Sequence, residues 1–305
     1  MHDIIIIGAG TAGMTAAIYG LRAGKSVLLI EAENFGGQIT FSPQIENYPG
    51  IAKISGDEFA TNLLEQAVAL GADTILEQVT EVRPESVQKV VVTKEKEYPC
   101  KSIIIATGVK HRHLGLKREA ELAGAGVSYC AICDGPFFKG RKVAVVGGGN
   151  TALEDAMLLS NTCEEVFLIH RRDTFRGDNH LIQRLQRKEN VTVILDTVIK
   201  GLQGTDSLEM IELLNKKDGE TTVLPVEGLF VAIGQVPNNE MFAEVVKLNE
   251  DGYVLAAEDC MTSGRGIYVA GDCRTKEVRQ LTTAAADGAV AALAACTYID
   301  QYTTG

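Results

Sequence analysis

The sequence predicts an α/β fold made of two similar domains, with the second inserted into the first. Three observations predict it. The chain has 305 residues, which suits two ordinary domains. An apolar strand, a glycine turn, a helix and a second apolar strand occur twice along it, and each copy closes with a third apolar strand. We expect residues 1–110 and 241–305 to form one domain and residues 111–240 to form the other.

The first copy begins with the apolar run 4–7, which leads into Gly8-Ala-Gly10-Thr11-Ala12-Gly13. A helical stretch and the apolar run 27–30 follow, and that run ends at Glu31, 23 residues after Gly8. The closing strand spans 103–108 and contains Ala106, Thr107 and Gly108. This order of strand, glycine turn, helix and strand is the Rossmann-like unit that binds dinucleotides.

The second copy begins with the apolar run 143–146, which leads into Gly147-Gly-Gly149-Asn150-Thr151-Ala152. The apolar run 166–169 ends at His170-Arg171-Arg172, again 23 residues after the first glycine, and the run 229–234 closes the copy. Two such units predict two nucleotide sites, one on each Rossmann-like domain.

The remaining segments follow from composition and periodicity. Residues 36–56 are rich in Gly, Pro, Asn and Ser and predict a loop. Residues 56–70 predict a helix with Phe59, Leu63, Leu64 and Val68 on one face. Residues 110–126 and 235–240 predict connectors between the domains. Residues 267–270 predict a strand that ends at Gly271-Asp272, and an Ala-rich helix follows over about 282–298.

Composition excludes several classes of protein. The net charge of −11 disfavours nucleic acid as the main partner, because phosphate binding needs a basic surface. No apolar run is expected to reach the ~20 residues that span a bilayer. The run 4–7 has no basic segment before it and predicts a buried strand, not a signal peptide. The seven scattered cysteines suit a reducing cytoplasm, and no Cys/His array predicts a metal site.

The two glycine turns predict different nucleotides. Glycine is needed where a turn is tight and where a pyrophosphate approaches the backbone, and Glu31 is placed to accept hydrogen bonds from an adenosine ribose. At the same position the second copy has His170, Arg171 and Arg172, followed by Arg176. Arginines suit a 2′-phosphate, so we expect NADPH there and an unphosphorylated adenosine at the first turn. A solvated basic surface is the alternative for the arginines.

Between the turns lies Cys130-Ala-Ile-Cys133, followed by Asp134. A CxxC pair is compatible with half a zinc site, with two buried structural cysteines or with a redox dithiol. The redox dithiol is the best of the three, because the other cysteines are isolated and the pair lies beside nucleotide-binding units. Asp134 could exchange protons with a thiolate. A flavin is the natural relay between a hydride and a dithiol.

These motifs together resemble the low-molecular-weight thioredoxin reductases along nearly the whole chain. The matching segments include Gly8–Gly13, Gly36-Gly37-Gln38, 46–50 with Asn47, Ala106-Thr107-Gly108, Cys130–Asp134, Gly147–Ala152, His170–Arg176, Gly271-Asp272 and Arg279-Gln280. The resemblance implies FAD in the first domain, lined by 31–38, Asn47 and 272–281, which ends at Leu281. It also implies that Cys133 faces the flavin, that Cys130 attacks the disulfide of thioredoxin and that Asp134 is the acid/base. A homodimer and a cytoplasmic location are implied as well.

Two rival functions remain open from the sequence. One is a related flavoenzyme that takes electrons from ferredoxin or runs backwards as a dithiol oxidase, and the Arg cluster disfavours it. The other is a non-catalytic redox sensor, which the CxxC-Asp segment disfavours. The order of motifs also predicts a rotation of the inserted domain about its connectors, because the CxxC and the second glycine turn must reach the same flavin in different steps. Cys273 is expected to be a packing residue, although a reactive thiol there stays open.

Overall fold

The computed structural model describes residues 1–84 and 88–302, which form two compact units. The first unit is Met1–Lys110 with Val236–Gly305, and the second is His111–Gln235. Residues 236–240, expected in the inserted domain, thus belong to the first unit. The reason is Asn239, which is fully buried and bonds through its amide to Gly252 O, Cys273 O and the Thr107 hydroxyl.

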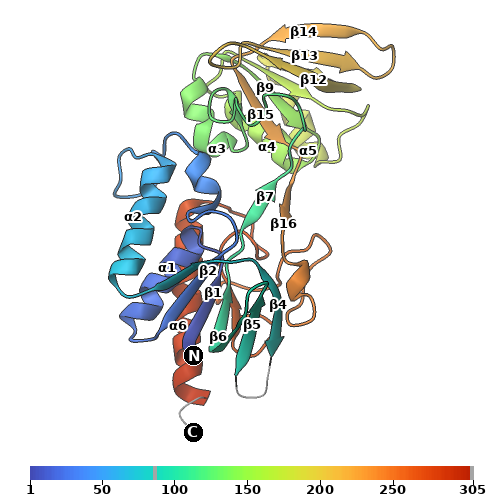
Figure 1. Cartoon of the computed structure of the whole chain (residues 1–305). Helices are drawn as coiled ribbons and strands as arrows, with labels where there is room; N and C mark the ends of the chain where they lie inside the picture. The colour runs from blue at the N-terminus through green and yellow to red at the C-terminus, as the bar shows by residue number, and fades with distance from the viewer. Residues whose placement is uncertain (85–87, 303–305) are drawn as a thin grey trace. The chain divides into compact units, whose positions relative to one another are not determined.

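The first unit is built on a seven-stranded sheet with the order β3-β2-β1-β6-β5-β4, in which β17 also pairs with β6 (Figure 1). Strands β1, β2, β3, β6 and β17 pair with one another in parallel, whereas β5 pairs antiparallel with both β6 and β4. Their bounds are β1 His2–Ile7, β2 Val27–Glu31, β3 Asp73–Leu76, β4 Val79–Pro84, β5 Lys89–Thr93, β6 Glu97–Ile105 and β17 Ile267–Val269.

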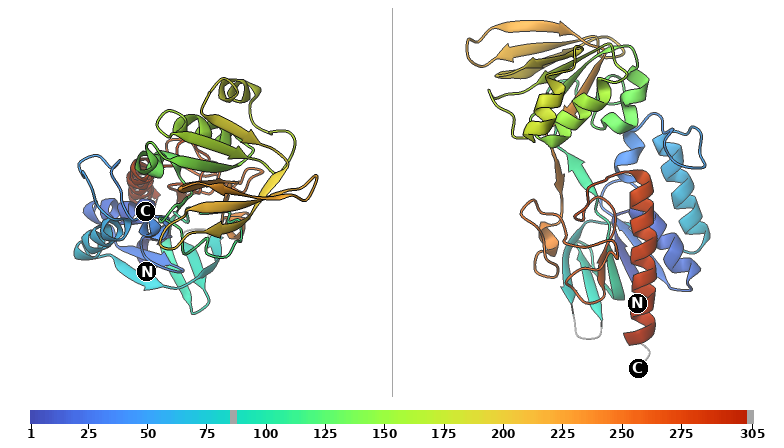
Figure 2. Two further views of the ribbon diagram at one scale, coloured as in Figure 1. Left: turned by 90° about the horizontal axis from the view of Figure 1, so that it is seen from above. Right: turned by 180° about the vertical axis from the view of Figure 1, so that it is seen from behind.

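Helices α1 (Thr11–Arg22), α2 (Gly56–Ala69) and α6 (Leu281–Tyr302) complete this unit, with short 3₁₀ turns at Gly37–Phe41 and Glu240–Phe242. Alternate residues of β1 serve two cores: Ile4 and Ile6 pack with α1 and α6, whereas Ile5 and Ile7 pack on the opposite face. Figure 2 shows α6 running along the first unit in its right-hand view.

Two expectations about helices were wrong. Val68 is 48% exposed, and Ala67 is buried in its place, because the buried face of α2 follows Phe59, Ala60 and Ala67. The second wrong expectation was that no apolar run reaches the ~20 residues that span a bilayer. By length and composition alone, the stretch Leu281–Gln301 is long and apolar enough to cross a membrane. A core helix passes the same test, and α6 buries Ala291, Ala292 and Ala295 in the core shared with α1.

The second unit has a five-stranded parallel sheet with the order β11-β10-β9-β15-β8 and a separate antiparallel sheet β12-β13-β14. The strands are β8 Val127–Ser128, β9 Lys142–Gly147, β10 Glu165–Ile169, β11 Val191–Ile194, β12 Thr197–Gln203, β13 Met210–Asn215, β14 Thr221–Pro225 and β15 Gly228–Ala232. The helices are α3 Ala131–Asp134, α4 Asn150–Leu159 and α5 Asn179–Leu185, with a 3₁₀ turn at Gly135–Phe138. The connectors β7 (Val109–His111) and β16 (Gln235–Pro237) pair with each other.

Candidate active site

The first glycine turn lies between β1 and α1, and two of its glycines have no room for a side chain. A Cβ on Gly8 would stand 2.3 Å from Ala106 O, and one on Gly13 would stand 1.9 Å from Gly8 O. A Cβ on Gly10 would meet only Gly36 O, at 3.8 Å. Gly8 and Gly13 are therefore needed for packing, whereas Gly10 leaves open space beside its backbone, as a bound pyrophosphate requires.

Thr11 and Ala12 are buried in the first turn of α1. Glu31, at the end of β2, accepts hydrogen bonds from the backbone N–H groups of Ala9, at 2.8 Å, and of Ala32 and Glu33, at 2.8 and 3.0 Å. A carboxylate has about four acceptor positions, so Glu31 anchors the turn and keeps capacity for a ribose hydroxyl.

The loop after β2 lies against this turn. Gly36 donates its N–H to Ala9 O at 2.8 Å, and a Cβ on Gly37 would stand 3.3 Å from the Cα of Gly10. Gln38 and Asn47 are exposed, and the Asn47 amide donates to Gln280 Oε1 at 3.2 Å. Gly36 and Gly37 therefore lie at the first glycine turn, and Asn47 lies at the start of α6.

The Gly271–Asp272 turn provides the strongest test of whether a cofactor fits the first unit. Asp272 is half-buried, and its Oδ1 is a buried oxygen with no hydrogen-bond donor among the described residues. Burial raises the pKa of Asp272, while Lys276 and Arg279 oppose that rise. A buried acceptor without a donor is costly, and a hydroxyl of a bound FAD would supply the donor.

The neighbours of this turn are consistent with that fit. Gly271 has a φ of +81°, and a Cβ there would stand 2.8 Å from the Cβ of Ala12. Arg279 donates to Asp272 O at 3.4 Å and lies over the Tyr253 ring. Gln280 directly precedes α6, which begins at Leu281. Ala106 is bonded to Ile7 O, and a Cβ on Gly108, where φ is +63°, would meet nothing within 4 Å.

The second glycine turn, between β9 and α4, has the same design. A Cβ on Gly147 would stand 2.3 Å from Ala232 O, whereas Gly149 has open space. Asn150 begins α4 and accepts a hydrogen bond from Asp178 N at 2.8 Å, and Thr151 beside it is exposed. Gly149 is thus the point where a second pyrophosphate could approach the backbone and the N-terminus of α4.

His170 and the arginines after it have different surroundings. The His170 ring fills the space over Gly148 and is 5% exposed, and its Nε2 lies 3.1 Å from Thr174 O. Burial lowers the pKa of His170, so its ring is neutral at neutral pH. Arg171, Arg172 and Arg176 are exposed, and among the described residues no hydrogen bond or ion pair occupies their guanidinium groups. These cations are available to a phosphate, whereas His170 supports the turn.

The cysteine pair lies at α3 in the second unit, directly after β8. Cys130 and Cys133 form a disulfide with their Cα atoms 5.3 Å apart, and both are half-buried. Burial raises the pKa of Asp134, and a hydrogen bond from Ser128 opposes that rise. The site therefore combines a two-electron centre with a carboxyl group that holds its proton to higher pH than an exposed aspartate.

The remaining cysteines, namely Cys100, Cys163, Cys260, Cys273 and Cys296, are buried and free. Cys273 is fully buried, with Sγ 3.4 Å from Ala270 O, and burial raises the pKa of its thiol. A buried thiol with a raised pKa is a poor nucleophile, which agrees with a packing role for Cys273.

Sequence reasoning missed three polar residues that support these sites. Ser128 bonds to Asp134, Asn239 ties Thr107 to the backbone at Cys273, and Asp287 bonds to Gly271 N. Asn239 and Asp287 contact residues distant in the sequence, whereas Ser128 contacts residues only two and six positions away, and none of the three belongs to a recognisable motif. The only signal in the sequence was a polar residue within a mainly apolar stretch, as with Asp287 in α6.

Comparisons with known proteins agree with this geometry. A sequence profile described as "Pyridine nucleotide-disulphide oxidoreductase" matches residues 2–288. The chain is 41% identical over 300 residues to a thioredoxin reductase of Treponema pallidum (strain Nichols), covering 98% of this chain and 97% of the relative. It is 39% identical over 302 residues to that of Listeria innocua, covering 99% and 95%. The crystal structure of thioredoxin reductase from Streptococcus pyogenes MGAS5005 superposes with a TM-score of 0.95 at 38% identity, covering 99% of each chain.

Proposed function

Since this chain belongs to the pyridine nucleotide-disulphide oxidoreductase family, we propose that it is an NADPH-dependent flavoenzyme that reduces the disulfide of thioredoxin through Cys130 and Cys133. One observation carries the proposal: a CxxC disulfide and a half-buried acid, Asp134, lie in the same compact unit as a glycine turn with free arginines. A dithiol needs a two-electron donor, and that turn suits NADPH.

The residues of the first unit would hold FAD. Gly10 leaves the backbone open to the pyrophosphate, and the Glu31 carboxylate has acceptor positions left for a ribose hydroxyl. The buried Oδ1 of Asp272 needs a hydrogen-bond donor. When bound, FAD supplies a two-electron relay between the hydride of NADPH and a disulfide. Gly149 and the N-terminus of α4 would bind the pyrophosphate of NADPH, and Arg171, Arg172 and Arg176 would bind its 2′-phosphate.

The thiol chemistry balances within the cysteine pair. Two electrons break the Cys130–Cys133 bond and leave two thiolates. Asp134 would give one proton to a leaving sulfur of thioredoxin, and the second proton comes from solvent. The Cys130 thiolate then attacks one sulfur of the thioredoxin disulfide, which breaks that bond and forms a mixed disulfide. The Cys133 thiolate attacks Cys130 Sγ, restores the internal disulfide and releases thioredoxin, which has gained two electrons and two protons as a dithiol.

A ferredoxin-linked flavoenzyme of the same fold is the rival function. It has no use for cations at a 2′-phosphate position, and the three free arginines speak against it. The proposal also includes a homodimer and a cytoplasmic location, which the family resemblance implies. Sedimentation of the purified protein tests the dimer.

The deciding experiment is NADPH oxidation by the FAD-loaded protein with and without thioredoxin disulfide. Turnover that requires both NADPH and a thioredoxin-type disulfide is the expected result. The same rate without any disulfide, or no turnover with a panel of purified thioredoxins, would contradict the proposal. An arm with reduced ferredoxin in place of NADPH separates the rival, which would turn over only there.

A further inference from the structure

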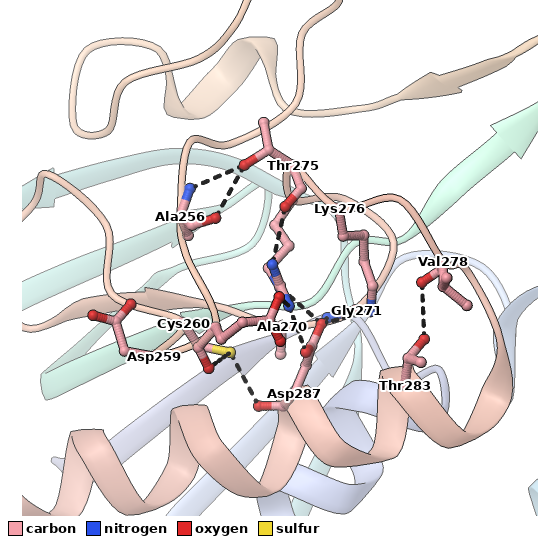
Figure 3. Close-up of polar contacts among 12 residues, drawn as sticks. Ala256, Asp259, Cys260, Ala270, Gly271, Thr275, Lys276, Val278, Thr283 and Asp287 are labelled. Atoms are coloured by element: carbon pink, nitrogen blue, oxygen red, sulfur yellow. Dashed lines mark hydrogen bonds and ion pairs between the residues drawn. The ribbon is translucent and has the colours of Figure 1, made fainter.

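A cluster of buried charges lies beside the Gly271–Asp272 turn and has no part in the chemistry described above. It consists of Arg274 and Lys276, which follow the turn, and Asp287, on α6. Arg274 is 2% exposed, Asp287 is 5% exposed, and the Lys276 side chain is 5% exposed. Figure 3 shows Lys276 and Asp287 reaching towards each other beside Gly271.

The carboxylate of Asp287 accepts four hydrogen bonds. Its Oδ1 accepts from Arg274 Nη2 at 2.9 Å. Its Oδ2 accepts from Arg274 Nε at 2.9 Å, from Lys276 Nζ at 2.9 Å and from the backbone N–H of Gly271 at 3.0 Å. Burial alone would raise the pKa of Asp287, but the bonds from Arg274 and Lys276 outweigh it and lower that pKa. Asp287 is therefore a fully satisfied buried anion at neutral pH.

Such a cluster is a poor means of gaining stability. Removing three charges from water is costly, and an apolar cluster of similar volume is often as stable or more so. What a fully bonded cluster does supply is a defined geometry. One of the four bonds comes from the backbone N–H of Gly271. The cluster therefore defines the conformation of the turn that carries Asp272.

The same part of α6 also contacts the first glycine turn. A Cβ on Gly288, the residue after Asp287, would stand 2.3 Å from Ala12 O, and a Cβ on Gly271 would stand 2.8 Å from the Cβ of Ala12. Ala12 belongs to the Gly8–Gly13 turn. Asp287 and Gly288 therefore join two segments, distant in sequence, that would each contact one FAD molecule.

We propose that Asp287, held by Arg274 and Lys276, is a positioning residue for FAD, because its bond to Gly271 fixes the Asp272 carboxylate relative to the first glycine turn. The inference rests on the proposed function, in which Asp272 accepts a hydrogen bond from FAD. Asp287 itself contacts no cofactor in this scheme. Asp287 affects FAD affinity indirectly, because it determines the position of the Asp272 carboxylate oxygen.

The test is flavin retention in Asp287→Asn. The amide keeps the shape but loses the negative charge and cannot accept all four bonds. Flavin release from the holoenzyme on dilution, followed by flavin fluorescence, should show a dissociation constant raised at least tenfold. The rise in melting temperature on adding FAD should shrink in parallel, since that rise depends on the ratio of ligand concentration to dissociation constant.

Two further variants separate positioning from general loss of stability. Asp287→Glu keeps the charge but displaces the carboxylate, so FAD affinity should again fall, and this variant decides the question if Asp287→Asn does not fold. Lys89→Met is the matched control. Lys89 is also buried in the first unit, and its partner Tyr298 lies eleven residues along α6 from Asp287, or about 16 Å. This control should lower the melting temperature and leave FAD affinity unchanged.

The outcomes are distinguishable. FAD affinity unchanged in Asp287→Asn or in Asp287→Glu would overturn the inference, as would an equal loss of affinity in Lys89→Met. Wild-type protein that takes up no FAD would instead contradict the proposed function.

Discussion

The hydroxyl of Ser128 lies 2.6 Å from a carboxylate oxygen of Asp134 and donates a hydrogen bond to it. The same hydroxyl accepts a hydrogen bond from the backbone N–H of Cys130 at 3.1 Å. Ser128 is 4% exposed, so the contact is shielded from water. One side chain therefore joins the backbone of the first cysteine to the acid that follows the second.

The first prediction concerns Ser128→Ala. The bond from Ser128 lowers the pKa of Asp134 against the rise caused by burial, so its removal should raise that pKa further. Turnover that requires protonated Asp134 declines as pH rises through the pKa of Asp134. This decline should therefore move to higher pH in Ser128→Ala. Ser128 also fixes the position of the Asp134 carboxyl group, on which general acid catalysis depends, so kcat with thioredoxin should fall roughly tenfold.

The control reaction for Ser128→Ala is NADPH-dependent reduction of ferricyanide, which needs no dithiol and should be unchanged. Ser128→Thr keeps the hydroxyl and should restore the wild-type pH profile. An unshifted pH profile in Ser128→Ala, or an equal loss in the ferricyanide reaction, would show that Ser128 only supports the fold.

The second prediction concerns the two cysteines. Either Cys130→Ser or Cys133→Ser should abolish reduction of thioredoxin and leave the ferricyanide reaction intact. In Cys133→Ser the remaining thiol has no internal partner to resolve it, so a lasting mixed disulfide with thioredoxin should accumulate. Non-reducing electrophoresis detects it. Accumulation mainly in Cys130→Ser would reverse the roles of the two cysteines.

Much of the parallel core was predictable from the sequence. The apolar runs 4–7 and 143–146 could only be buried strands, and the glycines after them have no room for side chains, as at Gly8 and Gly147. The antiparallel strands β12 to β14 were not predicted, because polar residues on their exposed faces interrupt the apolar pattern, as the exposed Thr221 and Thr222 of β14 illustrate. Val68 was assigned to the buried face of α2, where Ala67 lies instead. Positions 67 and 68 are three and four residues after Leu64, so both fit the spacing of one helical face.

The site residues also divide into those that the sequence predicts and those that it does not. Glycine spacing predicts the positions proposed to approach a ligand through the backbone, and the structure leaves open space at two of them, Gly10 and Gly149. The sequence did not show that His170 has a different role from Arg171, because the packing of the His170 ring over Gly148 is visible only in the tertiary structure. Asp287 bonds to Gly271, 16 residues away, and one sequence contains no signal for such a pairing. Ser128 bonds to Cys130 and Asp134 close by, but only the local fold shows that its hydroxyl points towards them.

The third prediction is a preference for NADPH over NADH. Each charge-assisted phosphate contact contributes roughly 1.5–3 kcal/mol, and Arg171 and Arg176 have no competing bond among the described residues. Arg171→Ala combined with Arg176→Ala should therefore raise KM for NADPH at least tenfold and barely change KM for NADH. Steady-state kinetics with both cofactors measures this.

Arg184→Ala is the matched control for the arginines, because Arg184 is an exposed arginine of the same unit on α5. It should change neither KM. Equal kcat/KM for NADPH and NADH in the unmutated enzyme would contradict the assignment of these arginines to a 2′-phosphate.

The last prediction concerns Asp155 on α4. Burial, with a smaller contribution from Glu154, raises the pKa of Asp155 from 3.8 to about 7. The folded protein therefore binds a proton that the unfolded chain has released between these two values. The stability that depends on this proton is fully present below pH 3.8 and is lost as pH rises through about 7. Asp155→Asn removes the titration, so its stability relative to wild type should increase by about 2–3 kcal/mol from pH 5 to about 7 and stay nearly level above.

Urea unfolding of the protein without nucleotide, at half-unit steps of pH, measures the difference between Asp155→Asn and wild type. Glu154→Gln provides an independent check, because removing the neighbouring charge lowers the pKa of Asp155 and should reduce only part of the pH dependence. Since Glu154 is exposed, its loss should not disturb packing. A constant difference between Asp155→Asn and wild type across this range would mean that Asp155 is ionised in the folded protein at every pH tested, and that the interior beside α4 is more hydrated than its burial indicates.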